Sequence, residues 1–478
     1  MIRIVGAGFA GVETAWACAS RSVAVTLYEM RPTKSSPAHT TDYFAELVCS
    51  NSLKSNSPTS PAGQLKSEMS ALGSIVLKTA AENSVPGGEA LCVDRNEFGR
   101  AMTALIEDHP LITVCRDEVT PEMVESWLGT TDLVVLASGP LTSPKLSQWL
   151  AAKSGREHLY FYDAVSPTVE ASSLDMNIVF AESRYGKGEG DDYLNCPFNK
   201  ENYEAFCAEL VAAERAPFHA FEAGGVRTDA TIDQEYAIGS GEEQLLEQIK
   251  YFAGCTPIEA IAEKGARSLA FGNFKPMGLT NPQTGKRPWA ALQLRPENKE
   301  KTLYSLVACQ TRMKFGEQRR IFRMVPGMEN AEFVRYGVIH RNTYLEAPKA
   351  LMPNLEMRST PNLFIAGQLT GVEGYVESAA MGILAGLQCL AKLEGREMPI
   401  PPRTTAYGAL LAHLQDDTPR EFAPMNINWG ILPDPDPVPR DKGVKRAMKI
   451  AAAQTGLSEW LEELGQSYLS SANSAMTS

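Results

Sequence analysis

A glycine-rich turn between an apolar strand and a helix is the feature that most constrains the fold. Residues 2–5 (IRIV) predict a short strand, Gly6, Gly8 and Gly11 follow with the G-x-G-x-x-G spacing, and residues 12–19 predict a helix rich in alanine. In this motif the first glycine permits the tight turn, the second lets the backbone approach a pyrophosphate, and the third packs the helix against the strand. The positive end of the helix faces the phosphates. The turn therefore predicts a dinucleotide site.

The next segment supplies the ribose contact that such a site requires. Residues 23–29 (VAVTLYE) predict a strand that ends at Glu29, about twenty residues after the turn, where an acidic side chain binds the ribose. A strand, turn and helix without a ligand is the alternative, and the position of Glu29 argues against it. We expect the cofactor contacts here to come from Gly6, Ala7, Gly8, Phe9, Ala10, Gly11 and Glu29.

A second cofactor-binding region is predicted far toward the C-terminus. Residues 131–140 predict a buried strand ending at a small-residue turn, and residues 361–386 predict a strand, a glycine-bearing loop and a helix rich in Ala and Gly. This spread is typical of FAD-binding Rossmann proteins, whereas an NAD dehydrogenase normally completes its site within one compact domain. Many FAD enzymes carry an acidic residue where this chain has Gln368, so the contact there must differ. The further contacts expected are Gly139, Gly367, Gln368, Gly371 and Gly374.

These segments predict an α/β fold: an FAD-binding, Rossmann-like, doubly wound domain with an α/β insertion domain and a helical C-terminal tail. We expect residues 1–150 and 331–400 to share one nucleotide-binding sheet, residues 151–330 to form the insertion, and residues 401–478 to form the tail. Within the insertion we expect strands at 177–183 and 303–309, a helix at 202–216 and a loop-like stretch at 222–244.

Composition excludes several classes of protein. A net charge of −12 disfavours a protein that coats nucleic acid, although the stretches 314–323 and 440–449 are locally basic. Nine cysteines without a CxxC pair indicate free thiols in a reducing compartment and support neither a metal site nor a disulfide framework. The start of the chain is too glycine-rich for a signal peptide, and no apolar run of about 18 residues predicts a membrane span. We expect a cytoplasmic protein.

Two cysteines lie beside polar turns, where reactive thiols are more common than inside apolar runs. Cys49 lies in ELVCSNSL and precedes a stretch rich in Ser, Asn and Pro, and Cys255 precedes Thr-Pro-Ile-Glu, which predicts the start of a helix. A thiol near a helix N-terminus experiences a positive field that favours the thiolate. For either cysteine taken alone a structural thiol is the more common explanation, and two such cysteines in one chain make a reactive role a real alternative.

A series of segments along nearly the whole chain is characteristic of one family. In order they are VGAGFAGVETAW, YEMRP, PAHTTD, AELVCSNSL, LCVDRNEF, DYLNCP, GCTPIE, KPMGL, VRYGVIHRNTYL, GVEGYVESAA and NWGILP. In them the chain resembles the FADH2-oxidising, methylenetetrahydrofolate-dependent tRNA (uracil-5-)-methyltransferases. The cysteine segments make the resemblance specific, because generic flavin oxidoreductases share only the glycine turn. The stretch 222–247 is longer than the charged helix of typical members, a difference that concerns the shape of the RNA-facing insertion.

The resemblance implies an activity and its cofactors. Such an enzyme methylates C5 of a T-loop uridine in tRNA, with methylenetetrahydrofolate as carbon donor, reduced FAD as carrier and reductant, and NADH or NADPH to reduce the flavin. By resemblance, Cys255 is the nucleophile that adds to uracil C6, and Cys49 is a second catalytic thiol close to the flavin. No metal and no obligate protein partner are expected.

The resemblance also suggests substrate contacts. His340 and Tyr344 are candidates to stack on the folate, and Arg341 and Lys275 are candidates to neutralise a folate carboxylate or an RNA phosphate. The segment 281–289 pairs basic residues with Trp289, which fits either a stacking site for an unpaired base or a surface hairpin turn.

Two other functions remain open at this point. A flavin oxidoreductase acting on a small molecule would need neither Cys49 nor Cys255. A flavoprotein that modifies wobble uridine or ribosomal RNA would share the glycine turn and the affinity for RNA.

Overall fold

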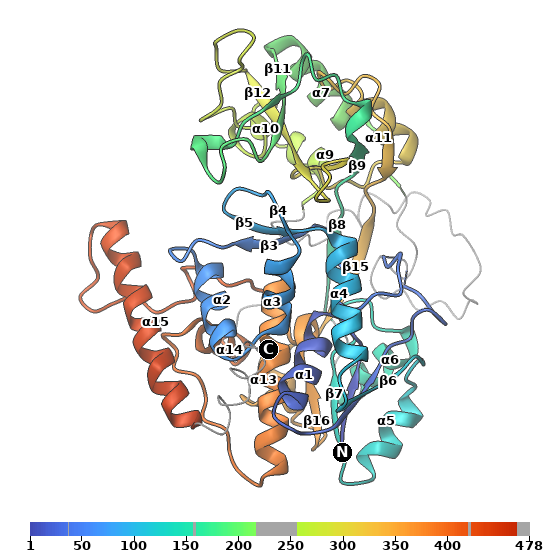
Figure 1. Cartoon of the computed structure of the whole chain (residues 1–478), viewed down its shortest axis with the longest axis vertical. Helices are drawn as coiled ribbons and strands as arrows, with labels where there is room; N and C mark the ends of the chain where they lie inside the picture. Colours follow the sequence, from blue (N-terminus) through green and yellow to red (C-terminus); the bar gives the residue numbers. More distant parts are fainter. Residues whose placement is uncertain (37, 156–158, 217–255, 419–421, 466–478) are drawn as a thin grey trace.

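Two sheets organise the chain, one near each end of the molecule's long axis (Figure 1). The computed structural model describes all residues except 37, 156–158, 217–255, 419–421 and 466–478. Both ends of the described chain belong to the lower half, and the insertion lies at the top of Figure 1. The FAD-binding, Rossmann-like α/β fold predicted from the sequence is confirmed.

The lower half is built on a parallel five-stranded sheet. Its strands, in spatial order, are β16 (Leu363–Ile365), β7 (Leu133–Leu136), β1 (Ile2–Val5), β2 (Val25–Tyr28) and β6 (Ile112–Cys115). The strands are short, and β7 is buried along its whole length, which explains its uninterrupted apolar sequence LVVL. Because β16 pairs with β7, the segment near residue 365 completes the sheet begun by the first strand, as expected.

Helices α1 (Phe9–Ala19) and α13 (Tyr375–Leu393) pack closely on one another. Glycines in α13 allow this approach, since a Cβ on Gly382 would lie 2.2 Å from the carbonyl oxygen of Ala10. Among the described residues, α13 is long and apolar enough to cross a membrane, but 89% of its apolar window is buried inside the protein, as in many core helices. The small residues of α13 thus hold the first and last parts of the cofactor site together.

Smaller elements complete the lower half. The short sheet β3-β5-β4 (Ser52–Ser55, Ala90–Val93, Ser84–Val85) lies at its upper edge in Figure 1. The helices before the insertion are α2 (Pro61–Ala71), α3 (Ile75–Glu82), α4 (Arg95–Glu107), α5 (Pro121–Leu128) and α6 (Pro144–Ser154). Side chains of Ser60, Ser74, Asp94 and Thr120 cap the first four of these helices by accepting from backbone N–H groups.

The C-terminal segment is integrated into the core, although the sequence suggested a tail. After α12 (Ala347–Ala350) and the 3-10 turn η4 (Gly367–Thr370), helices α14 (Ala406–Leu414) and α15 (Lys442–Leu464) both pack on α2. Tyr407 and Trp460 are fully buried in the same hydrophobic cluster as β1.

The insertion has an antiparallel sheet and a core of its own. Its strand order is β10 (Phe180–Ala181), β11 (Leu194–Phe198), β12 (Ala290–Pro296), β13 (Leu303–Leu306), β9 (Thr168–Glu170) and β14 (Phe333–Arg335). Its helices are η1 (Ala171–Ser173), η2 (Arg184–Gly186), α7 (Lys200–Ala212), α9 (Ile258–Ala262), α10 (Ser268–Phe271) and α11 (Phe315–Phe322). The strands expected at 177–183 and 303–309 and the helix at 202–216 are all present but shorter.

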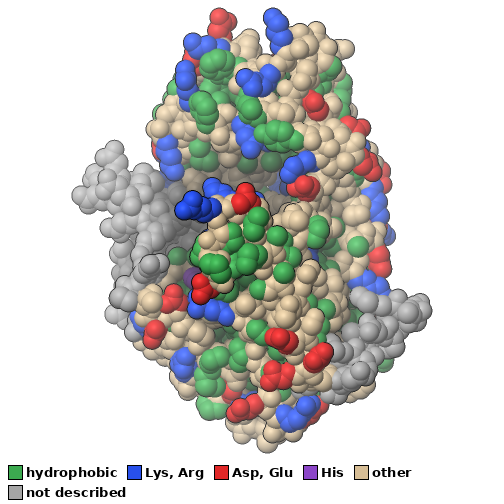
Figure 2. All heavy atoms as spheres, turned by 90° about the vertical axis from the view of Figure 1, so that its left-hand side faces the viewer, with side chains coloured by type: hydrophobic (Ala, Val, Ile, Leu, Met, Phe, Trp, Pro, Cys, Tyr) green, Lys and Arg blue, Asp and Glu red, His purple; other side chains and the backbone are tan. Residues whose placement is uncertain are grey.

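A two-stranded ribbon joins the halves. Strands β8 (Leu159–Ala164) and β15 (Ile339–Tyr344) pair antiparallel between the two sheets (Figure 1). We infer that the insertion begins and ends at this ribbon, a few residues beyond the 151 and 330 expected from the sequence. The molecular surface is hollowed where the two halves meet (Figure 2).

Candidate active site

A pocket opens at the carboxyl ends of β1, β2 and β7, where the strand order reverses and nucleotides bind in folds of this kind. It is bounded by the glycine turn, the loop after β2, the turn after β7 and the loop after β16. The residues predicted for the cofactor that line it are Gly6, Gly8, Phe9, Ala10, Glu29, Gly139, Gly367 and Gln368. The tertiary structure therefore brings the early and late cofactor segments to one cavity.

The three glycines of the first turn have distinct geometries. Gly6 has φ +99°, and a Cβ there would lie 2.6 Å from the Ala137 carbonyl oxygen, so the turn requires glycine. A Cβ on Gly11 would meet the Gly6 oxygen at 1.8 Å, which makes Gly11 a packing residue. At Gly8 nothing lies within 4 Å of such a Cβ. This open space at the start of α1 is where a pyrophosphate can approach the backbone.

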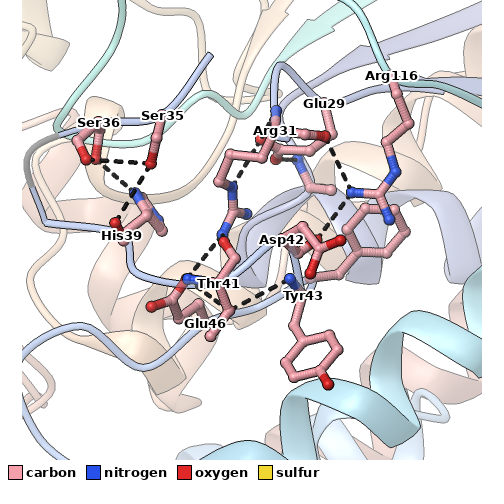
Figure 3. Close-up of polar contacts among 12 residues, drawn as sticks. Glu29, Arg31, Ser35, Ser36, His39, Thr41, Asp42, Tyr43, Glu46 and Arg116 are labelled. Atoms are coloured by element: carbon pink, nitrogen blue, oxygen red, sulfur yellow. Dashed lines mark hydrogen bonds and ion pairs between the residues drawn. The ribbon is translucent and has the colours of Figure 1, made fainter. Parts of the chain in front are cut away.

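Glu29 is held by a buried ion-pair network in the loop after β2 (Figure 3). Its Oε2 accepts from Ala7 N at 3.0 Å, and its Oε1 accepts from Arg31 N at 3.1 Å and from Arg31 Nε at 2.9 Å. Arg31 also donates from Nη1 to Glu46 Oε2 at 2.9 Å. Burial alone would raise the pKa of Glu29, but the hydrogen bonds and charge of Arg31 outweigh burial and lower it. The carboxylate thus stays ionised and keeps about one of its four acceptor positions for a ribose hydroxyl.

Gln368 lines the pocket where many FAD proteins have an acidic side chain. Its Nε2 donates to the carboxylate of Glu373, which is 7% exposed. A carboxylate therefore lies next to Gln368, although Glu373 is not among the residues that line the pocket. Gly371 and Gly374, which were also predicted to contact the cofactor, lie outside the pocket lining: their missing side chains make room for Phe422 and for the Lys54–Glu377 ion pair.

Cys49 lies at the edge of this pocket, just before β3. Its Sγ is 2.9 Å from Tyr375 Oη, and the same oxygen accepts from Cys49 N at 2.8 Å. The Tyr375 ring lines the pocket and stacks on Phe9 of the glycine turn, with ring centroids 4.7 Å apart. Burial raises the pKa of Tyr375 well above its usual value, so the phenol keeps its proton. Because its oxygen already accepts from Cys49 N, its O–H is available to donate to the sulfur.

Three arginines hold the loop on both sides of Cys49. Arg335 Nη1 donates to Val48 O at 3.3 Å, Arg295 Nη2 donates to Ser50 Oγ at 3.0 Å, and Arg95 Nη1 donates to Leu47 O. One buried carboxylate, Glu297, accompanies them and pairs with Arg95. Three guanidinium groups and this one carboxylate therefore meet at the Cys49 loop, and together they carry net positive charge.

The second predicted thiol, Cys255, lies outside the described residues. Helix α9 begins at Ile258, three residues later, as the Thr-Pro sequence predicted. The other eight cysteines are free, and six of them are buried; burial raises the pKa of Cys18 to about 12. Cys49 and Cys115 are half-buried, and of these two Cys49 is the one beside the pocket.

Of the remaining predicted substrate contacts, Tyr344 and Lys275 are not among the residues that line the pocket. His340 and Arg341 lie in β15, where they pair with residues 163 and 162 of β8. Tyr344, for which folate stacking stays a prediction, is 5% exposed, and its hydroxyl donates to Phe422 O at 3.4 Å. Lys275 is exposed in the segment after α10, near the start of β12.

Sequence reasoning missed the residues that orient the site. Tyr375 and Glu46 gave no local pattern, and Arg95, Arg295 and Arg335 come from α4, β12 and β14. The YEMRP segment contained a usable signal for Arg31, an arginine two residues after the ribose-binding glutamate.

Comparison with known proteins identifies the family and the fold. The family described as Glucose inhibited division protein A matches residues 1–235 and 228–397. The solved structure of GidA from Aquifex aeolicus in its form I crystal has a TM-score of 0.64 over 100% of this chain and 78% of its own, at 16% identity, and so shares the fold.

Curated relatives are much closer in sequence. Methylenetetrahydrofolate--tRNA-(uracil-5-)-methyltransferase TrmFO of Desulforudis audaxviator is 48% identical over 97% of this chain and 98% of its own length. The protein of the same name from Moorella thermoacetica is 49% identical over 90% of this chain and 91% of its own. The chain belongs to the TrmFO family of methylenetetrahydrofolate--tRNA-(uracil-5-)-methyltransferases.

Proposed function

We propose that this protein methylates C5 of a T-loop uridine in tRNA, with carbon from methylenetetrahydrofolate and electrons from FAD that NADH or NADPH has reduced, in the cytoplasm. The observation that carries the proposal is the position of Cys49, whose thiol contacts Tyr375 at the edge of a pocket built from the glycine turn. A flavin oxidoreductase acting on a small molecule has no need of a thiol in this position.

The residues present fit FAD. The open space at Gly8 and the N-terminus of α1 suit the pyrophosphate, and the free acceptor position of Glu29 suits the adenosine ribose. Gly367 and Gln368 suit the far part of the cofactor, next to Tyr375 and Cys49. FAD bound there would supply the two electrons that a methylene group needs to become methyl.

Methylation of C5 requires the uracil ring to be activated by a nucleophile. A thiolate that adds to C6 gives C5 carbanion character, and the thiol leaves when the C5 proton is lost. By resemblance we assign this step to Cys255. The one-carbon unit has the oxidation level of formaldehyde, so its conversion to methyl consumes two electrons and a proton and releases tetrahydrofolate.

We assign Cys49 as the second thiol, close to the cofactor. The Tyr375 hydroxyl and the charges of Arg95, Arg295 and Arg335 stabilise an anionic sulfur there. An anionic Cys49 can accept the C5 proton of the substrate or react transiently with the one-carbon unit.

The decisive experiment offers two labelled donors in parallel. Purified protein, unmodified tRNA transcript, FAD and NADPH would receive either carbon-labelled methylenetetrahydrofolate or methyl-labelled S-adenosylmethionine, and tRNA hydrolysates would be analysed for labelled 5-methyluridine. We expect label from the folate only, and only with a reductant. A sulfonium donor delivers a finished methyl group and needs no electrons, so label from S-adenosylmethionine would contradict the proposal.

A further inference from the structure

One face of the insertion is basic and apolar in a protein whose net charge is −12. We call it the 264–289 face; it carries the exposed basic side chains Lys264, Arg267, Lys275, Lys286 and Arg287. Within the described residues none of these five forms an ion pair, whereas most other exposed arginines near α11 do. Basic, hydrophobic and some acidic side chains lie at the top of the surface in Figure 2, and Glu182 accepts from Thr280 N on this face at 2.7 Å. Unpaired positive charge of this density favours a polyanion.

Large apolar side chains are exposed among these charges. Phe271 is 77% exposed, Met277 47% and Trp289 40%. Tyr185, 59% exposed, contacts the same face, since a Cβ on Gly278 would lie 2.8 Å from its ring. Exposed aromatic rings next to cations provide stacking platforms for unpaired bases. A charged surface that only contacts water does not need exposed aromatic rings.

Residues 274–291 of the face form a fixed surface, because their two segments are bound together. Arg287 Nη1 lies 3.0 Å from Met277 Sδ, and Ala291 N donates to Phe274 O at 2.9 Å. Asn281 and Lys286 close the intervening turn, with Asn281 N donating to Lys286 O at 3.0 Å. The rings and charges are therefore presented in one arrangement before any ligand arrives, which lowers the entropic cost of binding.

Strand β12 connects the face to the candidate active site. The strand starts directly after Trp289, and at its other end Arg295 donates to Ser50 while Pro296 O accepts from Asn51 Nδ2 at 2.9 Å. Seven extended residues span roughly 20 Å. The face and the Cys49 loop thus lie about one nucleic-acid helix diameter apart on a continuous strand.

We propose that the 264–289 face docks the RNA substrate, with its basic side chains on backbone phosphates and Trp289 or Phe271 stacked on an unpaired base. This inference rests on the proposed function and adds to it the surface that holds tRNA while the target uridine reaches Cys49. Docking would also account for Lys275, which is not among the residues that line the pocket but is exposed on this face.

The test compares two charge reversals of equal size. Lys286→Glu with Arg287→Glu changes the face, and Lys442→Glu with Arg446→Glu changes two exposed basic residues of α15 in the lower half. Binding of unmodified tRNA transcript is measured by filter retention at several salt concentrations, and kcat and KM for tRNA are measured together with flavin absorbance. We expect the face variant to raise Kd and KM at least tenfold, to reduce the salt slope by about 1–2, and to keep its flavin. The α15 variant should stay within about twofold of wild type.

Stacking is tested separately with Trp289→Ala and Trp289→Phe. The alanine variant should bind tRNA about 5- to 100-fold more weakly and the phenylalanine variant should recover most of the affinity, because any aromatic ring can stack. An equal loss of tRNA affinity in both charge variants, or an unchanged Kd in the face variant, would overturn the docking proposal. The proposed function would still stand if the wild-type protein methylated tRNA. Tight tRNA binding through this face without folate-dependent methylation would instead support docking and contradict the proposed function.

Discussion

Cys49 Sγ and Tyr375 Oη lie 2.9 Å apart although 326 positions separate them in the chain. The contact joins the loop before β3 to the first residue of α13, so it exists only when the early and late cofactor segments are assembled. It places the half-buried thiol next to a ring that stacks on the glycine turn. Activity should therefore depend on this hydroxyl more than on the tyrosine ring.

Tyr375→Phe removes the hydroxyl and keeps the stacking on Phe9. We expect kcat to fall about 10- to 100-fold, since the lost hydrogen bonds to the sulfur and to Cys49 N contribute about 1–3 kcal/mol, while bound flavin remains at the wild-type ratio. Rates of tRNA methylation and flavin absorbance measure the two effects. In a Cys49→Ala background the same substitution should cost nothing further, and an additive loss would show that Tyr375 acts elsewhere.

Gly8 and Gly11 should separate cofactor binding from folding. Gly8→Val places a side chain in open space, so the apoprotein should unfold at nearly the wild-type temperature but bind FAD poorly because the pyrophosphate is blocked. Gly11→Ala forces a Cβ to 1.8 Å from the Gly6 oxygen and should lower Tm of the apoprotein by several degrees. Calorimetry without FAD and flavin titration give the two readouts. A Gly8 variant that binds FAD normally would place the pyrophosphate elsewhere.

Arg335 is expected to increase the rate of methylation and to lower the free energy of unfolding. Its Nε and Nη2 are buried without a hydrogen-bond partner among the described residues, and burial, with the charge of Arg95, lowers its pKa to about 10. Arg335→Met removes a poorly compensated charge and should leave unfolding free energy unchanged or raise it by up to about 2 kcal/mol. Methylation should fall because less positive charge faces Cys49. Denaturant unfolding and single-turnover rates test both statements, and a loss of both stability and activity would indicate a structural role.

Two buried glutamates should make stability depend on pH. Glu13 accepts from the N-terminus of α3 and Glu68 from that of α14, and burial, only partly offset by these hydrogen bonds, raises the pKa of each to about 7. The folded state thus binds protons more strongly than the unfolded chain. The stability that protonation adds is fully present below about pH 4.5 and is lost as pH rises through 7, by up to about 3 kcal/mol per group.

Glu68→Gln removes one of these titrations. The Tm of the variant should change less between pH 5 and pH 8 than that of wild type, whatever its absolute value. Differential scanning calorimetry across this range measures the slope, and parallel curves would show that Glu68 does not change its protonation there.

Features that depend on local backbone geometry could be predicted from the sequence. The glycine spacing predicts the turn and the N-terminus of α1, and the small residues at 361–386 predict a close helix contact. These features were predictable because the steric limits at Gly6, Gly11 and Gly382 act over a few residues or within one packed helix pair. For the same reason the sheet, the insertion and the start of α9 after the Thr-Pro sequence were predictable. The sequence also showed that Cys49 lies among polar residues, but it did not show which side chains contact the thiol.

Tertiary structure alone decided what surrounds that cysteine. Tyr375 reaches it from α13, Arg95 from α4, Arg295 from β12 and Arg335 from β14, and none of these side chains has a local pattern that points to position 49. Likewise Tyr344 is buried against Phe422, which lies 78 positions later, and Gln368 donates to the Glu373 carboxylate. Contacts of this kind depend on which faces of distant elements pack together, and that is set by burial over the whole chain rather than by the preferences of neighbouring residues.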